Sequence, residues 1–288
     1  MTTCTRRQFL AGAAAAGAAA LSAGRSLAAG PPAKVKSGTD IVTLGRSGIR
    51  TIVLGIGTGT HGGREQRLLG PDGFARLWRH AYERGIRYID TADNYRMHGY
   101  VRRAIQGLPR DQLFIQTKTP AKQAADAKAD IERFRVELDV DYLDTVLMHA
   151  MGKGGYTQEM RPVMDVLFDA KQKGRVRAVG VSCHGYPPLE TSAGCDWTDV
   201  HLVRINPFGD MMDDVPERVA AQIRKMKDRN HGVIGMKIYG ETGYDSREKR
   251  LQSLKYVLGL GTVDAFTIGF TSTQQIDETL QLIAEALA

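Results

Sequence analysis

Four side chains that could move a proton stand at or just after the ends of short hydrophobic runs. Asp90 ends one run and Tyr95 follows it, Lys118 ends the next run, and His149 ends the third. A free tyrosine has a pKa of about 10, and a neighbouring ammonium lowers that value by stabilising the phenolate. Lys118 could supply the ammonium, Asp90 could keep it protonated, and His149 could hold a carbonyl or alcohol oxygen beside the Tyr95 hydroxyl. This set is suited to moving a proton on and off a carbonyl oxygen, and because it contains no reducing agent, a hydride must come from a cofactor such as a nicotinamide.

The elements that position these residues form a repeated strand and helix unit. Eight short runs rich in Val, Ile and Leu are separated by longer segments with helical spacing, such as Phe74, Leu77, Trp78 and Ala81. Strands covered on both faces by helices are nearly continuous in hydrophobicity. Eight such units predict an α/β fold of the (β/α)8 TIM barrel type, in which active residues gather at the carboxyl ends of the strands. The expected strands are Thr51 to Gly57, Arg87 to Ala92, Leu113 to Lys118, Leu143 to His149, Val176 to Ser182, Val200 to Asn206, Gly232 to Ile238 and Ala265 to Phe270.

A hairpin is expected before the first barrel strand. Residues 41–44 and 49–53 are apolar and flank Arg46-Ser47-Gly48, so they predict a β-hairpin across the bottom of the barrel. The glycine-rich stretch that follows is not a dinucleotide-binding fingerprint, because Thr60 stands where the third glycine belongs. Helix boundaries are also indicated: the expected N-caps are Asp72, Asp214 and Thr273, and the expected stops are Gly85, Gly107 and Gly174.

The first thirty residues have the layout of an export signal. Arg6-Arg7 precedes Phe-Leu and an alanine-rich stretch, and Ala28 closes a small-x-small cleavage motif. The paired arginines resemble the twin-arginine signal, which is understood to carry folded proteins. We therefore expect residues 1–29 to be a cleaved signal peptide, 30–40 a linker and 41–288 one barrel domain. The mature protein would be periplasmic or secreted, with the export machinery as a partner.

Composition excludes several other classes of protein. The 288 residues are 42% hydrophobic and 25% charged, which is typical of a globular domain. The formal charge of +7 falls once the three signal arginines are set aside, and no basic run with interleaved aromatic residues indicates nucleic acid binding. No stretch is long and apolar enough for a stable membrane span. We expect no metal site, since no ligand-spaced cluster is present. Whether Cys183 and Cys195 pair stays open.

The segments around the proton-moving residues resemble signature segments of the aldo/keto reductases. The resemblance rests on Gly85 to Tyr95, Phe114 to Lys118, Asp144 to His149 and Val179 to Ser182. It implies that Tyr95 is the general acid/base, tuned by Lys118 and Asp90, and that His149 orients the substrate carbonyl. It also implies NADP or NAD bound in extended form across the C-terminal face of the barrel.

The cofactor half of this resemblance departs from the family pattern. Cys183 stands where the family usually has Asn, Leu202 where Gln is expected, and Met236 where an aromatic residue stacks. Near the end of the chain, Gly269 and Gln275 replace the Lys and Arg of many members, so a preference for NADP over NAD is not supported. The expected cofactor-binding residues are Gly57, Thr58, Ser182, Cys183, Asn206, Met236, Lys237, Gly269, Phe270, Gln275 and Glu278.

The substrate is expected to be a small carbonyl compound or alcohol. Loops at 61–69, 96–99, 151–156 and 184–188 would line its pocket, and a polar, acidic or sugar-like compound would suit their side chains: Arg64, Arg67, His98, Lys153, Tyr156 and His184. Two alternatives to an exported oxidoreductase remain open. One is a barrel that binds a nucleotide or senses redox state without turnover, and the other is a lyase or isomerase that uses Tyr95 and Lys118 without hydride transfer.

Overall fold

The computed structural model describes residues 35–241 and 246–288, which form a closed eight-stranded barrel preceded by a two-stranded hairpin. The strand order around the barrel is β10-β3-β4-β5-β6-β7-β8-β9, so each strand from β3 to β9 is followed by its next neighbour in sequence. The predicted (β/α)8 barrel is confirmed. The signal segment lies outside the described residues. Within the described ranges, no helix is long and apolar enough to cross a membrane.

The barrel strands are parallel throughout, and the last strand closes on the first. Gly269 of β10 lies opposite Gly57 of β3, and Asp90 of β4 lies opposite Gly57 on its other side. All carboxyl ends therefore point to one rim. The strands are β3 (Leu54–Gly57), β4 (Tyr88–Asp90), β5 (Phe114–Thr119), β6 (Leu143–Met151), β7 (Val176–Cys183), β8 (Val200–Arg204), β9 (Gly232–Met236) and β10 (Ala265–Gly269).

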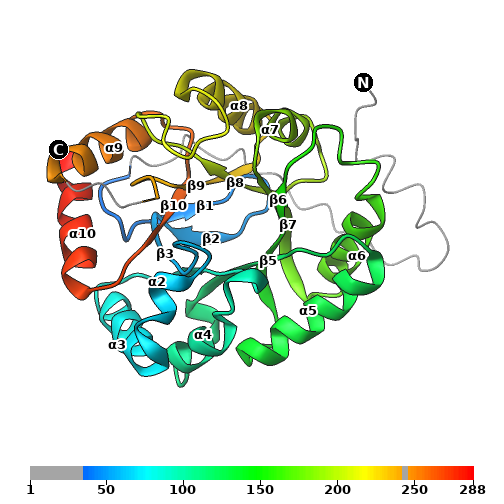
Figure 1. The fold of residues 1–288 in the computed structure, drawn as a ribbon, viewed down its shortest axis with the longest axis horizontal. Helices are drawn as coiled ribbons and strands as arrows, with labels where there is room; N and C mark the ends of the chain where they lie inside the picture. Colours follow the sequence, from blue (N-terminus) through cyan, green and yellow to red (C-terminus); the bar gives the residue numbers. More distant parts are fainter. Residues whose placement is uncertain (1–34, 242–245) are drawn as a thin grey trace, which may run out of the picture.

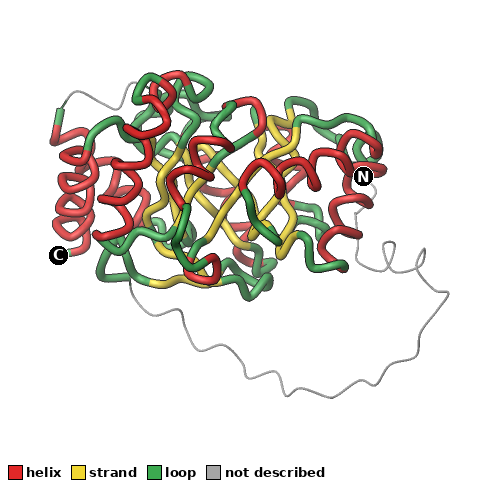
Figure 2. The backbone as a smooth tube through the Cα atoms, turned by 90° about the horizontal axis from the view of Figure 1, so that it is seen from below, coloured by secondary structure: helices red, strands yellow, loops and turns green. Residues whose placement is uncertain are grey.

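Helices surround the strands as an outer ring (Figure 1), and Figure 2 shows the same strands enclosed by helices from a second direction. Their buried faces follow the predicted spacing: Phe74, Leu77, Trp78 and Ala81 of α3 are buried. The helical elements are α2 (Arg64–Arg67), α3 (Gly70–Glu83), the 3-10 helix η1 (Asp93–Tyr95), α4 (His98–Ile105), the 3-10 helix η2 (Arg110–Gln112), α5 (Ala124–Leu138), α6 (Arg161–Gln172), α7 (Tyr186–Ala193), α8 (Pro216–Asp228), α9 (Arg247–Gly259) and α10 (Thr273–Leu287).

The predicted helix ends are correct at the stops and wrong at the starts. Gly85, Gly107 and Gly174 all have positive φ just beyond a helix, as a C-terminal glycine should. The N-caps are instead Leu69 for α3, Val215 for α8 and Ser272 for α10. A proline at the start of α3 and of α8 sets the first helical turn, so neither helix depends on a capping carboxylate.

The hairpin of β1 (Ile41–Thr43) and β2 (Arg50–Ile52) lies at the amino ends of the barrel strands, as predicted. Its turn residue Gly45 bridges to His231, which directly precedes β9. The Arg46 guanidinium donates to the carbonyl oxygen of Thr198, just before β8, at 3.1 Å. The hairpin therefore covers the end of the barrel opposite the carboxyl rim.

Candidate active site

The structure brings the four predicted proton-moving residues together at the carboxyl rim. Asp90 ends β4, Lys118 lies near the end of β5, His149 lies in β6, and Tyr95 ends η1. Lys118 Nζ donates to Asp90 Oδ1 at 2.7 Å and to the carbonyl oxygen of Thr91 at 2.8 Å. Lys118 Nζ lies 4.9 Å from the centre of the Tyr95 ring, and the rings of Tyr95 and His149 meet edge to face at 5.5 Å. The ammonium, the phenol and the imidazole therefore form one group.

The electrostatic balance at Tyr95 differs from the sequence-based expectation. Burial raises the pKa of the Tyr95 phenol above its ordinary value, and Asp90 adds to this effect. Lys118 acts in the opposite direction, as expected, but it does not outweigh burial. The phenol is therefore protonated at neutral pH, which makes it a proton donor in this state of the protein.

Lys118 remains charged although it is fully buried. Burial alone favours the neutral amine, but the contacts with Asp90 and Tyr95 outweigh that effect, and the pKa of Lys118 is raised. An ammonium is expensive to bury unless it is paired and hydrogen-bonded. The ion pair with Asp90 meets both conditions, so a positive charge stays fixed beside the phenol.

His149 is neutral. Burial lowers the pKa of its imidazole to about 3, and the positive charge of Lys118 contributes to the lowering. The ring also meets His184 edge to face at 6.3 Å. A neutral imidazole offers one N–H donor and one acceptor nitrogen, so His149 can hydrogen-bond an oxygen.

Gln116 is a site residue that sequence reasoning missed. Its Nε2 donates to Asp90 Oδ1 at 2.8 Å and to the Tyr88 hydroxyl at 2.9 Å, and its Oε1 accepts from the Thr145 hydroxyl at 2.9 Å. All of these groups are buried. Gln116 therefore holds the carboxylate that holds Lys118. The available signal was its spacing, because residues two apart in a strand share a face and Gln116 precedes Lys118 by two.

The loop after β3 closes on the Tyr95 ring. A Cβ added at Gly59 would lie 2.6 Å from Tyr95 Cε2 and Cζ and 2.9 Å from its hydroxyl oxygen. Arg67, which was expected to face the substrate, instead donates to the carbonyl oxygens of Tyr95 and, at 2.9 Å, Gly62. Arg67 therefore holds the backbone of Tyr95, and the absence of a side chain at Gly59 makes room for its ring.

Three site residues are followed by a non-glycine residue with left-handed backbone. The residues with left-handed backbone are Arg96 after Tyr95, Ala150 after His149, and Lys237 after Met236, the last with φ 58°. This conformation is unfavourable for residues with a side chain and collects at functional sites. The backbone is therefore strained at three places around the carboxyl rim.

A cavity of about 430 Å³ opens beside Asp90 and Tyr95 and extends between the loops after β3, β9 and β10. Five of the expected cofactor residues line it: Gly57, Met236, Lys237, Gly269 and Gln275. A Cβ at Gly269 would lie 2.1 Å from the Thr60 hydroxyl oxygen, so a larger residue there would have to displace the Thr60 side chain. The cavity therefore joins Asp90 and Tyr95 to the loops after β3, β9 and β10.

The other expected cofactor residues do not line this cavity. Thr58 is buried and donates to the carbonyl oxygen of Asp90 at 3.0 Å, while Ser182, Cys183 and Phe270 are buried in or beside their strands. Asn206 is also buried, and its Nδ2 donates to the carbonyl oxygen of Lys237 at 3.0 Å, so it shapes the loop after β9. These residues support the rim.

Glu278 and the two cysteines also lie outside the cavity lining. The Glu278 carboxylate accepts from Arg250 at 2.9 Å, so it pairs with α9. Cys183 and Cys195 are both buried and are not disulfide-bonded to each other, and burial raises the pKa of the Cys183 thiol. Cys183 is therefore a neutral group below the rim.

Interactions of Glu241 link two of the loops that line the cavity. The Glu241 carboxylate forms an ion pair with Lys237 and accepts from the His61 backbone N–H at 3.0 Å, joining the loops after β9 and β3. Glu65 also lines the cavity. Among the described lining residues, Lys237 is the one lysine or arginine, and its charge is met by Glu241.

A second charged pair at the rim, Arg204 and Asp213, was also missed. Arg204 ends β8, forms an ion pair with the fully buried Asp213, and faces the loop after β7, where the Gly185 N–H donates to Asp213 at 2.7 Å. Arg204 contributes to lowering the pKa of His184 to about 4, after burial. The pair fastens two loops of the rim to each other.

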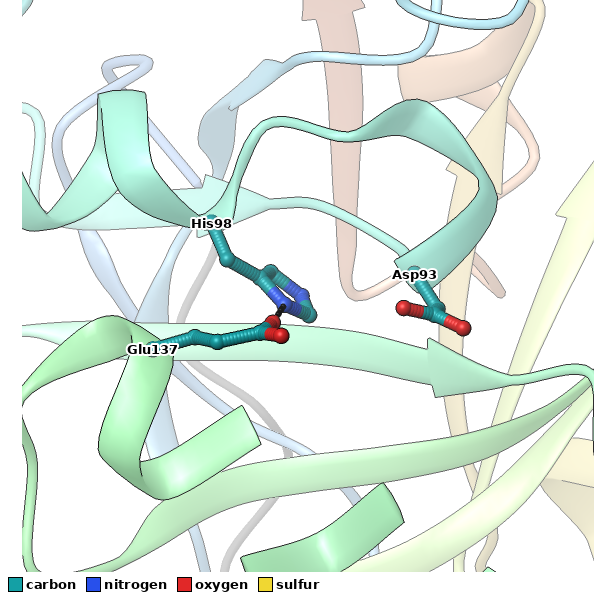
Figure 3. Close-up of side chains that lie close together, drawn as sticks. All are labelled: Asp93, His98 and Glu137. Carbon is teal, nitrogen blue, oxygen red and sulfur yellow. Dashed lines mark hydrogen bonds and ion pairs between the residues drawn. The ribbon is translucent and has the colours of Figure 1, made fainter. Parts of the chain in front are cut away.

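Two expected substrate-loop residues are buried instead. Tyr156 is 4% exposed, and His98 is likewise 4% exposed and lies behind β5. The His98 ring is hydrogen-bonded on both nitrogens. One bond joins it to Glu137 at 2.7 Å (Figure 3), and the other joins it to Thr117 at 2.8 Å. The His98 ring also packs edge to face against Phe134 of α5, so it lies between β5 and α5 and away from the cavity.

A closed (β/α)8 barrel with proton-moving side chains at the carboxyl ends of its strands defines a barrel enzyme. The model of the Aldo/keto reductase family matches residues 53–285. The chain therefore belongs to the aldo/keto reductase family, and the resemblance seen in its sequence is confirmed.

Several known proteins are similar to this chain. It is 36% identical over 108 residues to an aldo-keto reductase from Mycobacterium avium, covering 35% of this chain and 36% of that protein. It is 29% identical over 135 residues to the methylglyoxal reductase DkgB of Salmonella typhi, covering 44% of this chain and 50% of that protein. The match to an NADH-specific methylglyoxal reductase of Escherichia coli is 24% identical over 176 residues and covers 52% of this chain and 51% of that protein. The matches thus span about half or less of the relatives.

Solved structures agree on the fold. An aldo-keto reductase described as putative, from Pseudomonas aeruginosa, superposes with a TM-score of 0.73 at 22% identity and covers 88% of this chain and 98% of that one. An aldo-keto reductase from Bacillus halodurans gives a TM-score of 0.70 at 17% identity, covering 86% and 95%. At these identities the similarity establishes the barrel.

Proposed function

We propose that this protein reduces a small carbonyl compound to an alcohol, with Tyr95 as the proton donor and a nicotinamide nucleotide as the source of hydride. The observation that supports this most is the position of the Tyr95 phenol, which lies beside buried Lys118 and His149 at the edge of a cavity of about 430 Å³. Carbonyl reduction needs a proton on the oxygen and a hydride on the carbon, and this site provides the first.

The chain's own residues orient the carbonyl and deliver the proton. His149, being neutral, can donate one hydrogen bond to the substrate oxygen, and Tyr95 can transfer its hydroxyl proton to the same oxygen. The phenolate left behind is stabilised by the Lys118 ammonium, which Asp90 keeps charged. The nucleotide, when bound, supplies the hydride.

The cavity at the rim offers the groups that would hold the nucleotide. Gly57 and Gly269 leave space at paired positions of β3 and β10, Met236 offers an apolar surface, and Lys237 offers a positive charge. Gln275 caps α10 through its Oε1, which accepts from the backbone N–H groups of Thr271 and Ser272 at 2.8 and 3.3 Å. These residues would hold the nucleotide along the rim.

We further propose that NADH serves at least as well as NADPH. A 2′-phosphate carries about two negative charges and is normally met by Arg or Lys. The described lining has one such residue, Lys237, already paired with Glu241, and Glu65 adds negative charge. The similarity to an NADH-specific enzyme of Escherichia coli supports the same choice. A kcat/KM clearly higher for NADPH than for NADH would contradict it.

The substrate proposed is a short, polar, neutral carbonyl compound. The carboxylates Glu65 and Glu241 line the cavity, which disfavours an acidic substrate. Two of the similar proteins are methylglyoxal reductases, which supports methylglyoxal as the first compound to assay. A panel should add neutral sugars, keto acids and aliphatic aldehydes, and turnover of keto acids alone would contradict the proposal.

The test of the catalytic proposal is Tyr95→Phe, with Tyr82→Phe as the matched control. The Tyr82 hydroxyl donates to Gln112 at the surface, so its loss should leave activity unchanged. Tyr95→Phe should lower kcat for methylglyoxal reduction by at least about 100-fold while nucleotide binding persists. Full activity in Tyr95→Phe would refute the assignment.

We also propose that the protein is exported through its twin-arginine segment. The support is the sequence alone: Arg6-Arg7, the alanine-rich stretch and the small residues near Ala28. Cell fractionation with N-terminal sequencing should find a mature chain that begins near Ala29. Replacing both arginines by lysine should retain the protein in the cytoplasm, and unchanged export would contradict the proposal.

A further inference from the structure

A charged network on the outer side of β5 joins the turn that carries Tyr95 to the strand that carries Lys118. Its centre is Arg133 on α5. The two terminal nitrogens of Arg133 donate to Asp93 at 2.8 Å, to Glu137 at 2.9 Å and to Asp130 at 2.7 Å. Three carboxylates on two different elements thus converge on one guanidinium.

One branch of the network holds the Tyr95 turn. Asp93 is the first residue of η1 and Tyr95 is its last, so the carboxylate held by Arg133 lies two residues from the catalytic phenol. The three residues of η1 span a single tight turn. A displacement of Asp93 is therefore transmitted to the Tyr95 ring.

A second branch holds the strand that carries Lys118. Asp130 accepts from the Thr119 hydroxyl at 2.5 Å, and Thr119 follows Lys118 directly. In a strand, neighbouring side chains point to opposite faces. Lys118 points into the barrel, so Thr119 points outward to α5, where Arg133 holds Asp130 in place.

The third branch runs through His98 and reaches the other neighbour of Lys118. Figure 3 shows the His98 ring beside Glu137, with Asp93 close by. Because a carboxylate only accepts, Nδ1 of His98 carries the proton toward Glu137 at 2.7 Å, and Nε2 accepts from the Thr117 hydroxyl at 2.8 Å. Both neighbours of Lys118 are thus tied to α5.

The cluster has the composition of a metal site, but an arginine already serves it. Ligand atoms of Asp93, His98 and Glu137 lie within 4.8 Å of one another. Arg133 donates to both carboxylates, and the hydrogen bond with Asp93 raises the pKa of Arg133, so a permanent positive charge occupies the place where a cation would act. The groups are arranged to hold the guanidinium.

Solvent exposure indicates what this network contributes. The Arg133 side chain is 42% exposed, and ion pairs at such exposure add little to folding stability. Its contacts nevertheless cross from η1 to α5 and, through Asp130 and Glu137, to both sides of Lys118. The network therefore acts on geometry more than on stability.

We propose that Arg133 is a positioning residue that sets the place of Tyr95 relative to Lys118. This inference rests on the proposed function of Tyr95 as the proton donor. Arg133 touches neither ring nor ammonium, and it acts through Asp93 on one side and through Asp130 and the Glu137–His98 pair on the other.

The test compares Arg133→Met with Arg133→Lys and with Arg135→Met. Arg135 lies on the same helix and bonds to Glu132 and, at 2.6 Å, to the carbonyl oxygen of Asp141, away from the rim. Arg133→Met should lower kcat by about 10- to 100-fold with KM changed by less than about threefold, since a shift near 1 Å at a reacting group has that effect. Arg133→Lys should recover part of the loss, and Arg135→Met should match the wild type.

A second readout does not depend on turnover. With 13C at the phenol carbon of tyrosine, the Tyr95 signal is assigned by its loss in Tyr95→Phe, and its titration is followed by NMR. Because Lys118 lowers the pKa of Tyr95, a turn that moves away from Lys118 should titrate at higher pH in Arg133→Met. Asp93→Asn should shift the titration in the same direction, and it substitutes if Arg133→Met does not fold.

The outcomes separate the two proposals. A wild type that turns over no carbonyl compound with either nucleotide contradicts the proposed function, and the Tyr95 titration then decides the role of Arg133 by itself. An unchanged titration in Arg133→Met overturns the inference, as does a kcat loss equal to that of Arg135→Met. A raised titration with partial rescue by lysine supports it.

Discussion

Replacing Gly59 by alanine should disable the site while Asp90, Tyr95, Lys118 and His149 all keep their side chains. The added Cβ would lie 2.6 Å from Tyr95 Cε2 and Cζ, whereas carbon atoms rest at about 3.5 Å or more. The ring cannot retreat freely, because Lys118 Nζ lies 4.9 Å from its centre and the His149 ring lies 5.5 Å away. The phenol must therefore shift by about 1 Å, a displacement that can cost about 100-fold in rate, or roughly 2.7 kcal/mol.

The assay for this variant is steady-state reduction of methylglyoxal with NADH. Gly59→Ala should lower kcat by about 100-fold. Gly99→Ala is the matched control, because a Cβ at Gly99 meets open space and its backbone φ is not positive. The melting temperatures of both variants should stay close to that of the wild type. Activity of Gly59→Ala within about twofold of the wild type would refute the packing argument.

Three further predictions concern the buried polar groups. Lys118→Met should lower kcat by at least about 100-fold and move the Tyr95 titration to higher pH, and an unmoved titration, followed by 13C NMR, would contradict the role of the ammonium. Gln116→Leu should lower the free energy of unfolding by about 2–3 kcal/mol, because it leaves the buried groups of Asp90, Tyr88 and Thr145 short of a partner. A loss well below about 1 kcal/mol in urea denaturation would contradict this prediction. The free energy of unfolding should fall as the pH drops from about 6.5 toward 4, because burial lowers the pKa of His231 to about 4 and that of His201 well below its usual value, so the unfolded chain binds more protons over this window. Denaturation curves at about pH 7 and pH 5 would refute that prediction if they coincided, and His231→Gln should weaken the pH dependence.

The sequence predicts the barrel, and it predicts that the four rim residues come together, because both depend on local order. Hydrophobic runs with polar residues at or just after their carboxyl ends specify strands and rim together, so Asp90, Lys118 and His149 fall into place once the strands do. The hairpin and the helical stops follow from turn chemistry at single glycines. These features can be predicted without knowing which strands become neighbours.

Features that depend on burial and closure could not be predicted. The pKa of Tyr95 is raised because burial outweighs Lys118, and the extent of burial follows only from the loop that brings Gly59 onto the ring. Gln116 gains its partners from β4 and β6 once these strands flank β5. His98 was expected in a substrate loop, but the start of α4 turns it inward behind β5.

The pH dependence of carbonyl reduction by the wild type tests the central claim most directly. If the protonated Tyr95 phenol is the acid, kcat should stay level from about pH 6 to 9 and fall only above about 10, since burial raises the pKa of Tyr95 above its ordinary value. The loss at high pH should be absent from the residual activity of Tyr95→Phe. A fall in kcat centred near about pH 7 would contradict the claim, because it would assign the proton to a group other than this tyrosine.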